Sequence, residues 1–337
     1  MRIAVVIPSY RVTRHILPLL ARIGPEAWRI FVVDDRCPDG SGDVVESGCT
    51  DPRVVVLRNP VNLGVGGAVL AGYAAAVAAG ADAIVKLDGD GQMDPALIAL
   101  FVAPIAAGEA DYTKGNRFFD LARIRRMPPA RIFGNAVLSF MTKLSSGYWD
   151  VFDPTNGYTA IDARVAALLP ADRISRRYFF ETDMLFRLNT FRAVVQDVPM
   201  DAHYGDEVSG LRISRILGEF LFKHARNFCK RIFYNYYLRD FSAASLELVA
   251  GLGLSAFGVG FGAYHWWLSA AEGTTTPTGT VMLAVLPVLV GLQLLLAFLS
   301  QDVANTPRLP IGKRLRPQAD AQRATEAAMR DAARPSP

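Results

Sequence analysis

Two long apolar runs near the C-terminus constrain the fold of this chain more than any other feature. Residues 244–268 contain one acid and no Lys or Arg, and residues 279–301 contain no charged residue. Each run is long enough to cross the hydrocarbon core of a bilayer, where only helices or closed barrels satisfy the backbone. The mean hydropathy of +0.21 is high for a purely soluble chain. We expect a hairpin of two transmembrane helices, with two buried helices of a soluble core as the alternative.

Basic residues flank this hairpin on both sides. Segments 222–240 and 307–317 are rich in Lys and Arg, whereas the loop 269–278 contains neither. The positive-inside rule then places both flanks in the cytosol. The sequence therefore predicts an integral membrane protein whose N-terminal domain and both termini are cytoplasmic. The net charge of +4 suits anionic membrane lipid near the hairpin better than nucleic acid, so we expect no nucleic-acid partner.

The N-terminus and the cysteines carry no sign of export. Residues 1–10 contain a short apolar run that meets a proline without a small-residue cleavage site, so we expect no signal peptide. The three cysteines, Cys37, Cys49 and Cys229, show no metal-ligand spacing and are odd in number. They indicate a reducing compartment without a disulfide framework.

Short β-branched runs alternate with helical stretches in the first hundred residues. The runs that we predict as strands are 3–7, 29–34, 53–57 and 83–88. Apolar strands separated by helices are typical of β-α-β units, with a mostly parallel sheet buried on both faces. The predicted class is α/β. We expect four regions: a catalytic or binding domain over 1–210, amphipathic juxtamembrane helices over 211–242, two transmembrane helices over 243–302, and a mobile tail over 303–337.

Polar residues follow the predicted strands, and ligands collect at the carboxyl ends of such strands. Asp88 and Asp90 lie one residue apart after the fourth strand, between glycines and just before Gln92. Two carboxylates this close can share a divalent cation, and hard oxygen ligands suit Mg²⁺ or Mn²⁺. Because Mg²⁺ usually completes its shell with substrate phosphates, the pattern predicts a metal-bridged nucleoside diphosphate. A solvated turn is the alternative.

Two further strand ends support a nucleotide site. Asp34 and Asp35 follow the second strand, where a carboxylate can accept hydrogen bonds from a base or ribose, or cap a helix. The glycine-rich segment 59–72 runs into a helix, which would direct backbone N–H groups toward a nucleotide or its phosphates. Close helix packing is the alternative for its Gly-x-Gly-Gly spacing. The segment lacks the Gly-x-Gly-x-x-Gly fingerprint of dinucleotide dehydrogenases.

The segments VVIPSY (5–10), VVDD (32–35), NLGVGGA (62–68) and DGDGQMDP (88–95), in this order, resemble family 2 glycosyltransferases of the GT-A fold. The Asp-x-Asp-x-Gln form followed by two C-terminal apolar helices is similar to the polyprenyl-phosphate subgroup, which includes dolichyl-phosphate mannose synthase and bacterial polyprenyl-phosphate glucosyltransferases. The resemblance covers about residues 1–301. One departure is that Arg11 and Val12 stand where the family usually has an acid. This departure affects the selectivity for the nucleotide base.

The resemblance implies a role for each matching residue. The implied donor-binding residues are Pro8, Tyr10, Asp35, Asn62, Gly64, Asp88, Gly89, Asp90, Gln92 and His203. The implied metal ligands are Asp88, Asp90 and Gln92, for Mg²⁺ or Mn²⁺. The implied acceptor-side residues are Arg117, Arg131, Asp153 and Asn156. Asp88, Asp90, Arg117 and Arg131 would carry catalysis, since the two arginines would align a lipid phosphate.

The implied reaction is an inverting transfer of a sugar from a nucleotide sugar, UDP in preference to GDP, to a membrane polyprenyl phosphate. An ionised phosphate needs no general base, only positioning and stabilisation of the leaving diphosphate. One alternative is a hydroxyl acceptor, with Glu181 or Asp183 as the base. Another is a membrane-anchored scaffold that binds a nucleotide sugar without turnover. The sequence leaves the sugar and a homo-oligomeric state open.

Overall fold

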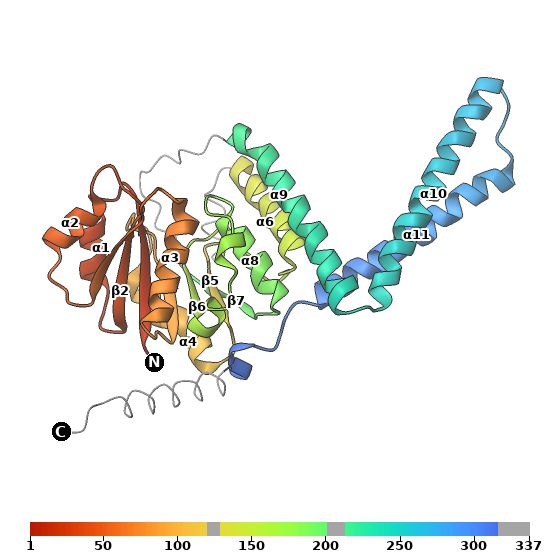
Figure 1. Ribbon diagram of the computed structural model, residues 1–337. Coiled ribbons are helices and arrows are strands. Elements are labelled where there is room, and N and C mark those ends of the chain that lie inside the picture. Colours follow the sequence, from red (N-terminus) through yellow and green to blue (C-terminus); the bar gives the residue numbers. More distant parts are fainter. Residues whose placement is uncertain (120–128, 201–212, 316–337) are drawn as a thin grey trace. The chain divides into compact units, whose positions relative to one another are not determined.

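A seven-stranded sheet forms the centre of the N-terminal part of the chain (Figure 1). The computed structural model describes residues 1–119, 129–200 and 213–315. The strands are β1 (Ile3–Ser9), β2 (Ala27–Asp34), β3 (Val54–Arg58), β4 (Ala83–Lys86), β5 (Tyr112–Asn116), β6 (Thr159–Asp162) and β7 (Val195–Pro199). The predicted strands 3–7, 29–34, 53–57 and 83–88 are all present, with ends that differ by one or two residues.

The strand order is β3-β2-β1-β4-β6-β5-β7. β1 to β4 run parallel to one another, and β5 pairs in parallel with β7, whereas β6 is antiparallel to both of its neighbours. Since β6 separates β4 from β5, those two strands point in the same direction. The carboxyl ends of β1, β2, β4 and β5 therefore meet at one edge of the sheet, and the predicted α/β class with a mostly parallel sheet is confirmed.

Helices cover both faces of this sheet. They are α1 (Ile16–Arg22), α2 (Ser41–Gly48), α3 (Gly64–Ala78), α4 (Ile98–Ala107), α6 (Pro129–Ser146), α7 (Ala163–Ala166) and α8 (Phe180–Thr190), with short 3₁₀ turns η1 (Pro95–Leu97) and η2 (Ala171–Arg173). Successive residues of β1 point to opposite faces. Ala4 and Val6 accordingly join a core with α3 and α8, and Val5 and Ile7 join one with α1 and α4.

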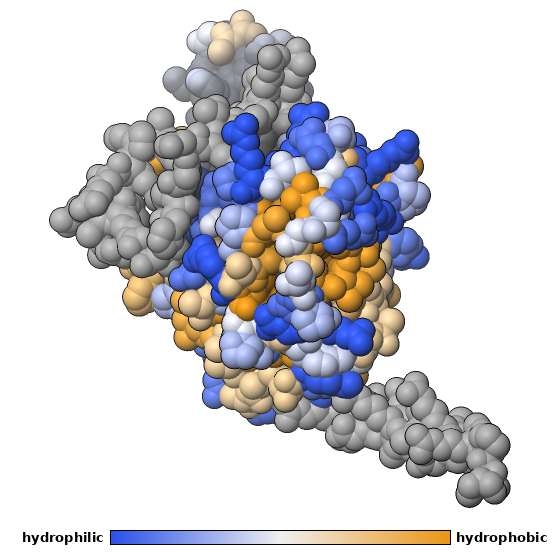
Figure 2. Space-filling view, turned by 90° about the vertical axis from the view of Figure 1, so that its left-hand side faces the viewer, coloured by the Kyte–Doolittle hydropathy of each residue, from blue (hydrophilic) through white to orange (hydrophobic). Residues whose placement is uncertain are grey.

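β3 is an edge strand, and Val54 to Leu57 are only half-buried. Seen from the side of α1 and α2, the surface shows a hydrophobic band between hydrophilic borders (Figure 2). This edge strand is less completely covered than β1, β2, β4 and β5, which all lie further inside the sheet.

The chain divides into two compact units, Met1–Asn227 with Pro307–Pro337, and Phe228–Thr306. The first unit thus includes chain from beyond the hairpin. Asp111 is fully buried, and its carboxylate accepts N–H groups from Ile311 at 2.9 Å, Gly312 at 2.7 Å and Val194 at 2.8 Å. Ile311 and Leu315 also pack on the α3 side of the core. The expected mobile tail over 303–337 is therefore wrong for residues 307–315, which we call the C-terminal strap.

The second unit contains the two long apolar helices, α10 (Ala243–Glu272) and α11 (Thr278–Ala304), which pack on each other. Within the described residues, these two have the length and composition to cross a membrane, and most of their surface is exposed. Before them lies the π-helical turn η3 (Tyr234–Arg239). A buried ion pair joins Arg231 to Asp302 at 2.6 Å, and the Tyr236 hydroxyl donates to Asp302 at 2.7 Å.

Helix α9 (Ile213–Phe233) leads from the first unit into the second. Its His224 Nδ1 lies 2.9 Å from Ser145 Oγ of α6, and Asn227 donates to Asp183 of α8 at 2.9 Å. Leu221 and Phe222 on the same helix are exposed. His224 and Asn227 of α9 thus pack against the sheet domain, so that domain extends beyond the boundary expected at residue 210.

Candidate active site

Two adjoining cavities open at the edge where β1, β2, β4 and β5 end. The Tyr10 cavity, of about 560 Å³, is lined by Pro8, Tyr10, Asp35, Asn62, Gly64 and Arg177, among others. The Arg117 cavity, of about 520 Å³, is lined by Lys86, Gln92, Arg117, Asn156 and Glu181, among others. Both cavities share Val65, Asp88, Asp90 and Tyr178. The acids after β4 therefore lie at the junction of the two cavities.

Asp35 is buried and holds the glycine-rich turn in place. Its Oδ1 accepts the Leu63 N–H and the Asn59 amide, each at 2.8 Å, and its Oδ2 accepts the Gly64 N–H at 2.7 Å. A carboxylate that accepts several backbone N–H groups makes strong, charge-assisted bonds. Asp35 lines the Tyr10 cavity as expected, but much of its hydrogen-bonding capacity is used by its own chain.

The start of α3 is also occupied by the protein itself. The N–H groups of Gly66 and Gly67 donate to the carbonyl of Arg176 at 2.8 and 3.3 Å, and those of Leu63 and Gly64 donate to Asp35. The expectation that these N–H groups point at a nucleotide or its phosphates is therefore wrong. The glycines instead allow a second loop to approach closely, because a Cβ on Gly64 would lie 2.7 Å from the Arg176 carbonyl oxygen.

Asp88 and Asp90 form the acidic junction. Asp88 Oδ1 lies 2.8 Å from the ammonium of Lys86, and its side chain is 30% exposed. Asp90 Oδ1 accepts the N–H of Gln92 at 2.9 Å. Gly157 leaves space beside Asp88, since a Cβ there would lie 2.6 Å from Asp88 Oδ2.

These residues fit a divalent cation only in part. The described residues contain no group of three or more His, Cys, Asp or Glu side chains that could hold a metal. Asp88, Asp90 and Gln92 supply hard oxygen ligands, and a Mg²⁺-like ion would take its remaining ligands from water and substrate phosphates. The donor set therefore suits a metal that arrives with a diphosphate better than a permanently bound one.

Lys86 was missed by the sequence analysis, although a charged residue inside the apolar run AIVKLD was the available signal. It is buried, and its ammonium lies 2.8 Å from Asp88 Oδ1 and 3.4 Å from Glu181 Oε1. Burial alone lowers the pKa of Lys86, but the charges of Asp88 and Glu181 outweigh it and raise the pKa above its ordinary value. Lys86 thus stays charged and links an acid of β4 to an acid of α8.

Glu181 and Asp183 have different surroundings, although the sequence offered both as a base. Glu181 lines the Arg117 cavity. Asp183 is fully buried, with Oδ2 accepting the Ser175 N–H at 2.7 Å and Oδ1 accepting the Asn227 amide at 2.9 Å. Asp183 is therefore a structural residue that joins α8, the preceding loop and α9, and it is wrong as a candidate base.

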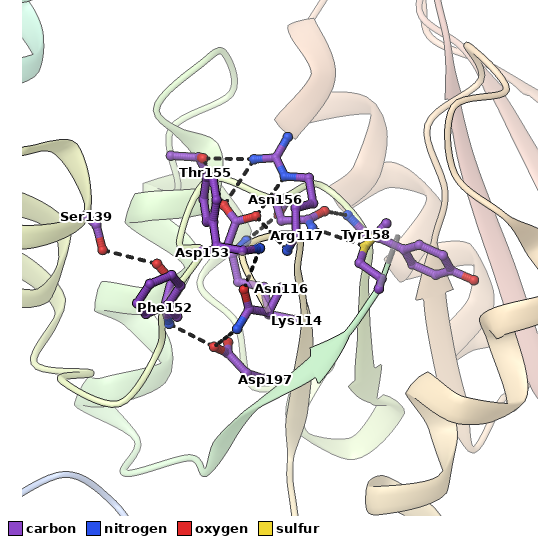
Figure 3. A network of polar contacts seen from close by, with 12 residues as sticks. Lys114, Asn116, Arg117, Ser139, Phe152, Asp153, Thr155, Asn156, Tyr158 and Asp197 are labelled. Carbon is purple, nitrogen blue, oxygen red and sulfur yellow. Dashed lines mark hydrogen bonds and ion pairs between the residues drawn. The ribbon is translucent and has the colours of Figure 1, made fainter. Parts of the chain in front are cut away.

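Arg117 follows β5 and is held by Asp153 (Figure 3). The Arg117 Nε and Nη2 donate to the two carboxylate oxygens of Asp153 at 2.7 and 3.0 Å, and Nη2 also donates to Thr155 at 3.3 Å. Asp153 is fully buried and does not line the cavity, so it positions the arginine rather than forming a wall of a sugar pocket. Asn156 lines the cavity, and its carbonyl accepts a hydrogen bond from Lys114.

Two more buried charges support this network. Burial lowers the pKa of Lys114 to about 8. Asp197 Oδ2 accepts the Asn116 amide at 3.2 Å and the Phe152 N–H at 2.8 Å, as Figure 3 shows, and burial raises its pKa to about 6. Asp197 thus ties the end of β5 to the segment that carries Asp153.

The other predicted positions divide into two groups. Pro8, Asn62 and Gly89 line the Tyr10 cavity with Tyr10, whose side chain is 43% exposed. The side chain of Arg131 on α6 and the whole of His203 lie outside the described residues. The cavities therefore bring together most of the residues that the sequence singled out, from the segments that follow β1, β2, β3, β4 and β5.

Comparison with known proteins agrees with this architecture. A model of the family "Glycosyl transferase family 2" matches residues 4–168. An undecaprenyl-phosphate mannosyltransferase of Micrococcus luteus is 30% identical over 205 residues, which cover 59% of this chain and 83% of that protein. A UDP-N-acetylglucosamine–dolichyl-phosphate N-acetylglucosaminyltransferase of Methanococcus voltae is 26% identical over 216 residues, covering 60% of this chain and 86% of that protein.

Solved structures share the fold. The glucosyl-3-phosphoglycerate synthase of Mycobacterium tuberculosis, in complex with phosphoglyceric acid, has a TM-score of 0.51 at 17% identity, over 69% of this chain and 79% of that one. The same enzyme in complex with Mn²⁺, UDP-glucose and phosphoglyceric acid also gives a TM-score of 0.51 at 17% identity, over 68% and 79% of the two chains. At this identity the likeness concerns the fold.

Proposed function

The chain belongs to glycosyltransferase family 2, and we propose that it transfers a sugar from a nucleoside-diphosphate sugar to a membrane polyprenyl phosphate. The single observation that carries this proposal is the placement of Arg117. Its guanidinium, held by Asp153, lines the cavity that also contains Asp88 and Asp90. A cation for an acceptor phosphate and acids for a metal-bound donor thus lie on the two sides of one junction.

The Tyr10 cavity is the proposed donor site. Pro8, Tyr10 and Asp35 would hold the base and ribose, and the diphosphate would extend toward Asp88 and Asp90. A Mg²⁺ or Mn²⁺ ion held by Asp88, Asp90 and Gln92 would supply a positive charge that stabilises the leaving diphosphate. A UDP-sugar is the favoured donor, because the Methanococcus voltae relative is named for a UDP-sugar and the structurally similar synthase was crystallised with UDP-glucose and Mn²⁺.

The Arg117 cavity is the proposed acceptor site. A lipid phosphate is ionised near neutral pH, so its oxygen can attack the anomeric carbon without a general base. Arg117 would orient that phosphate through its planar set of N–H donors, with Arg131 as a second cation. Attack from the side opposite the diphosphate would invert the anomeric configuration. The relatives from Micrococcus luteus and Methanococcus voltae are named for undecaprenyl and dolichyl phosphate acceptors.

The apolar helices suit an acceptor that resides in the bilayer. α10 and α11 would form the transmembrane hairpin, and the basic segments on both sides of it would keep the catalytic unit and both termini in the cytosol. The proposed regions are a catalytic domain, juxtamembrane helices and the hairpin, with the C-terminal strap completing the catalytic domain.

A hydroxyl acceptor remains the second candidate, because Glu181 lines the Arg117 cavity. In that reaction Glu181 would remove the hydroxyl proton. Its contact with Lys86 argues against this role, since one oxygen of the Glu181 carboxylate already faces the Lys86 ammonium at 3.4 Å. A non-catalytic nucleotide-sugar binder would have no need for Arg117 held at the acid junction.

The proposal is tested with the full-length protein in membranes, supplied with a polyprenyl phosphate and a panel of radiolabelled UDP- and GDP-sugars. We expect label in the organic phase with one donor, released by mild acid as phosphate-linked sugar, and lost in Asp90→Ala. Transfer of label only to a water-soluble or hydroxyl acceptor would support the second candidate. Metal-dependent donor binding without transfer to any acceptor would overturn both enzymatic proposals.

A further inference from the structure

We propose that Arg177 binds the diphosphate of the nucleotide donor, on the side of the Tyr10 cavity that the loop before α8 provides. This inference rests on the proposed function and adds a residue that neither the sequence pattern nor the metal ligands indicate. The only signal in the sequence was the pair Arg176 and Arg177 directly before Tyr178 and α8. The structure separates the roles of these two arginines.

The backbone of this loop is fixed from two sides. The Arg176 carbonyl accepts the N–H groups of Gly66 and Gly67, and the Ser175 N–H donates to the buried Asp183. The contact with α3 depends on glycine, because a Cβ on Gly66 would lie 2.7 Å from the Ser175 carbonyl oxygen. The sequence suggested the start of α3 as a phosphate site. It instead holds in place the loop that carries Arg177.

The two arginine side chains differ in position. Arg177 lines the Tyr10 cavity, and its Cγ lies 3.0 Å from the point where a Cβ on Gly64 would stand. Arg176 lines neither the Tyr10 cavity nor the Arg117 cavity, and its carbonyl makes the contact with α3. Tyr178 lines both cavities. The loop thus places Arg177, and not its neighbour, at the wall of the cavity that contains Asp88 and Asp90.

The charges of the cavity favour an anion beside Arg177. Asp35 is bonded to its own chain, and Asp88 is paired with Lys86. Across the described residues, the Arg177 guanidinium has no ion-pair or hydrogen-bond partner. The other cation of the cavity, Arg11, lies over the Tyr10 ring, with 5.5 Å between its guanidinium carbon and the ring centre. Arg11 is therefore placed beside the proposed base-binding residue, and Arg177 is the cation available to the phosphates.

A guanidinium suits this task because its planar fork of donors can bind two phosphate oxygens at once. With the metal ligands on one side of the diphosphate and Arg177 on another, the negative charge that grows on the leaving group would be held at two points. Lysine offers a single point charge and should replace Arg177 only in part.

Calorimetry on the full-length protein in detergent tests the inference, with UDP, GDP, UMP and uridine as ligands in the presence of Mn²⁺. We expect Arg177→Ala to weaken the binding of the nucleoside diphosphate about 10- to 100-fold, and that of uridine not at all. The affinity of Arg177→Lys for the nucleoside diphosphate should lie between those of the wild type and Arg177→Ala. Arg176→Ala is the matched control, since it keeps the backbone carbonyl that contacts α3. Its affinity for the nucleoside diphosphate should match that of the wild type.

Thermal melting establishes that each variant is folded. If Arg177→Ala is not folded, Arg177→Gln replaces it, because glutamine retains side-chain carbons against Gly64. Equal diphosphate affinity in wild type and the Arg177 variant would overturn the inference, as would an equal loss for uridine and UDP. If the wild type binds none of the diphosphates, the proposed function fails as well. If it binds them through Arg177 but transfers no sugar to lipid, only the acceptor assignment fails.

Discussion

Two pairs of acids follow β2 and β4, the strands on either side of β1, and they have different main uses. Asp34 and Asp35, after β2, are buried and bonded to backbone N–H groups: Asp34 accepts those of Cys37 at 2.7 Å and Gly42 at 2.8 Å, and Asp35 accepts two from the glycine-rich turn. Asp88 and Asp90, after β4, face the two cavities.

The difference lies in the number of N–H donors that the following loop provides. The loop after β2 and the loop after β3 both bring N–H groups to the two acids that follow β2. The loop after β4 donates the Gln92 N–H to Asp90, and Asp88 is balanced by the side chain of Lys86, the buried last residue of β4. Asp34 and Asp35, the saturated pair, mainly stabilise the fold and leave Asp35 only part of its capacity for a ribose. Asp88 and Asp90, the open pair, line the cavities and can bind a ligand.

The largest expected effect is on the open pair. Asp90→Ala should lower sugar transfer by about a thousandfold, because a metal-stabilised leaving group is worth several kcal/mol. Its unfolding free energy should fall by about 1 kcal/mol, since the turn hydrogen bond from the Gln92 N–H is lost. Transfer assays and melting curves measure the two effects, with Asp172→Ala, an exposed acid on η2, as control. A large loss of stability in Asp90→Ala would show that Asp90 stabilises the fold as Asp34 and Asp35 do, which would contradict the comparison.

For the saturated pair we expect a large effect on the unfolding free energy. Asp35→Ala leaves two backbone N–H groups and the Asn59 amide without their acceptor, which should cost about 3 kcal/mol of unfolding free energy. Asp39→Ala, an exposed acid of the next loop, should change stability by less than about 0.5 kcal/mol. Thermal and denaturant unfolding in detergent checks both variants. An unchanged melting temperature for Asp35→Ala would contradict the comparison.

Asp197 lies between the two classes, because its Oδ2 is bonded while its buried Oδ1 lacks a partner within the described residues. Burial raises its pKa from an ordinary 3.8 to about 6. The folded state therefore keeps this proton where the unfolded state has lost it, so the contribution of Asp197 to stability falls as pH rises from about 4 to 6.

Asp197→Asn should remove that slope and raise stability at pH 7 by up to about 2 kcal/mol, since the amide oxygen can still accept the Phe152 N–H. Unfolding measured from pH 4 to 8 tests this, with Asp172→Asn as the exposed control. A steeper slope in the Asp197 variant, or a loss of stability at pH 7, would show that the charge itself is needed by Lys114 and its neighbours.

The smallest effect concerns Glu181, which lines the Arg117 cavity and would accept a proton only if the acceptor were a hydroxyl. Glu181→Gln should change transfer to a polyprenyl phosphate by less than about tenfold, whereas loss of a general base costs about 100-fold or more. Initial rates at saturating donor distinguish the two, with Asp90→Ala assayed in parallel as the inactive reference. A 100-fold loss would move the acceptor from a phosphate to a hydroxyl.

Much of the fold could be predicted from local patterns. β1 to β4 are continuous apolar runs, and the two apolar helices have the length of a bilayer, so periodicity and composition were sufficient. The antiparallel β6 and the outer strands β5 and β7 were not predicted. Their segments are short, and their pairing is set by contacts with strands far away in the sequence.

The site could be predicted less completely for the same reason. Asp88 and Asp90 have a local signature, but Lys86, Asp197 and Arg177 acquire their surroundings from other parts of the chain. The glycine-rich turn gave a misleading signal, because glycine next to a helix start suits both an anion and a closely packed carbonyl. Only the position of Arg176 distinguishes the two.

The C-terminal strap determines when this protein can finish folding. Asp111 is translated two hundred residues before Ile311 and Gly312, whose N–H groups its carboxylate accepts. The ribosome must therefore synthesise both apolar helices before the last piece of the sheet domain is available. A protein cut short after the hairpin would leave a buried carboxylate without two of its donors, so completion of the sheet domain is coupled to the synthesis of the two apolar helices.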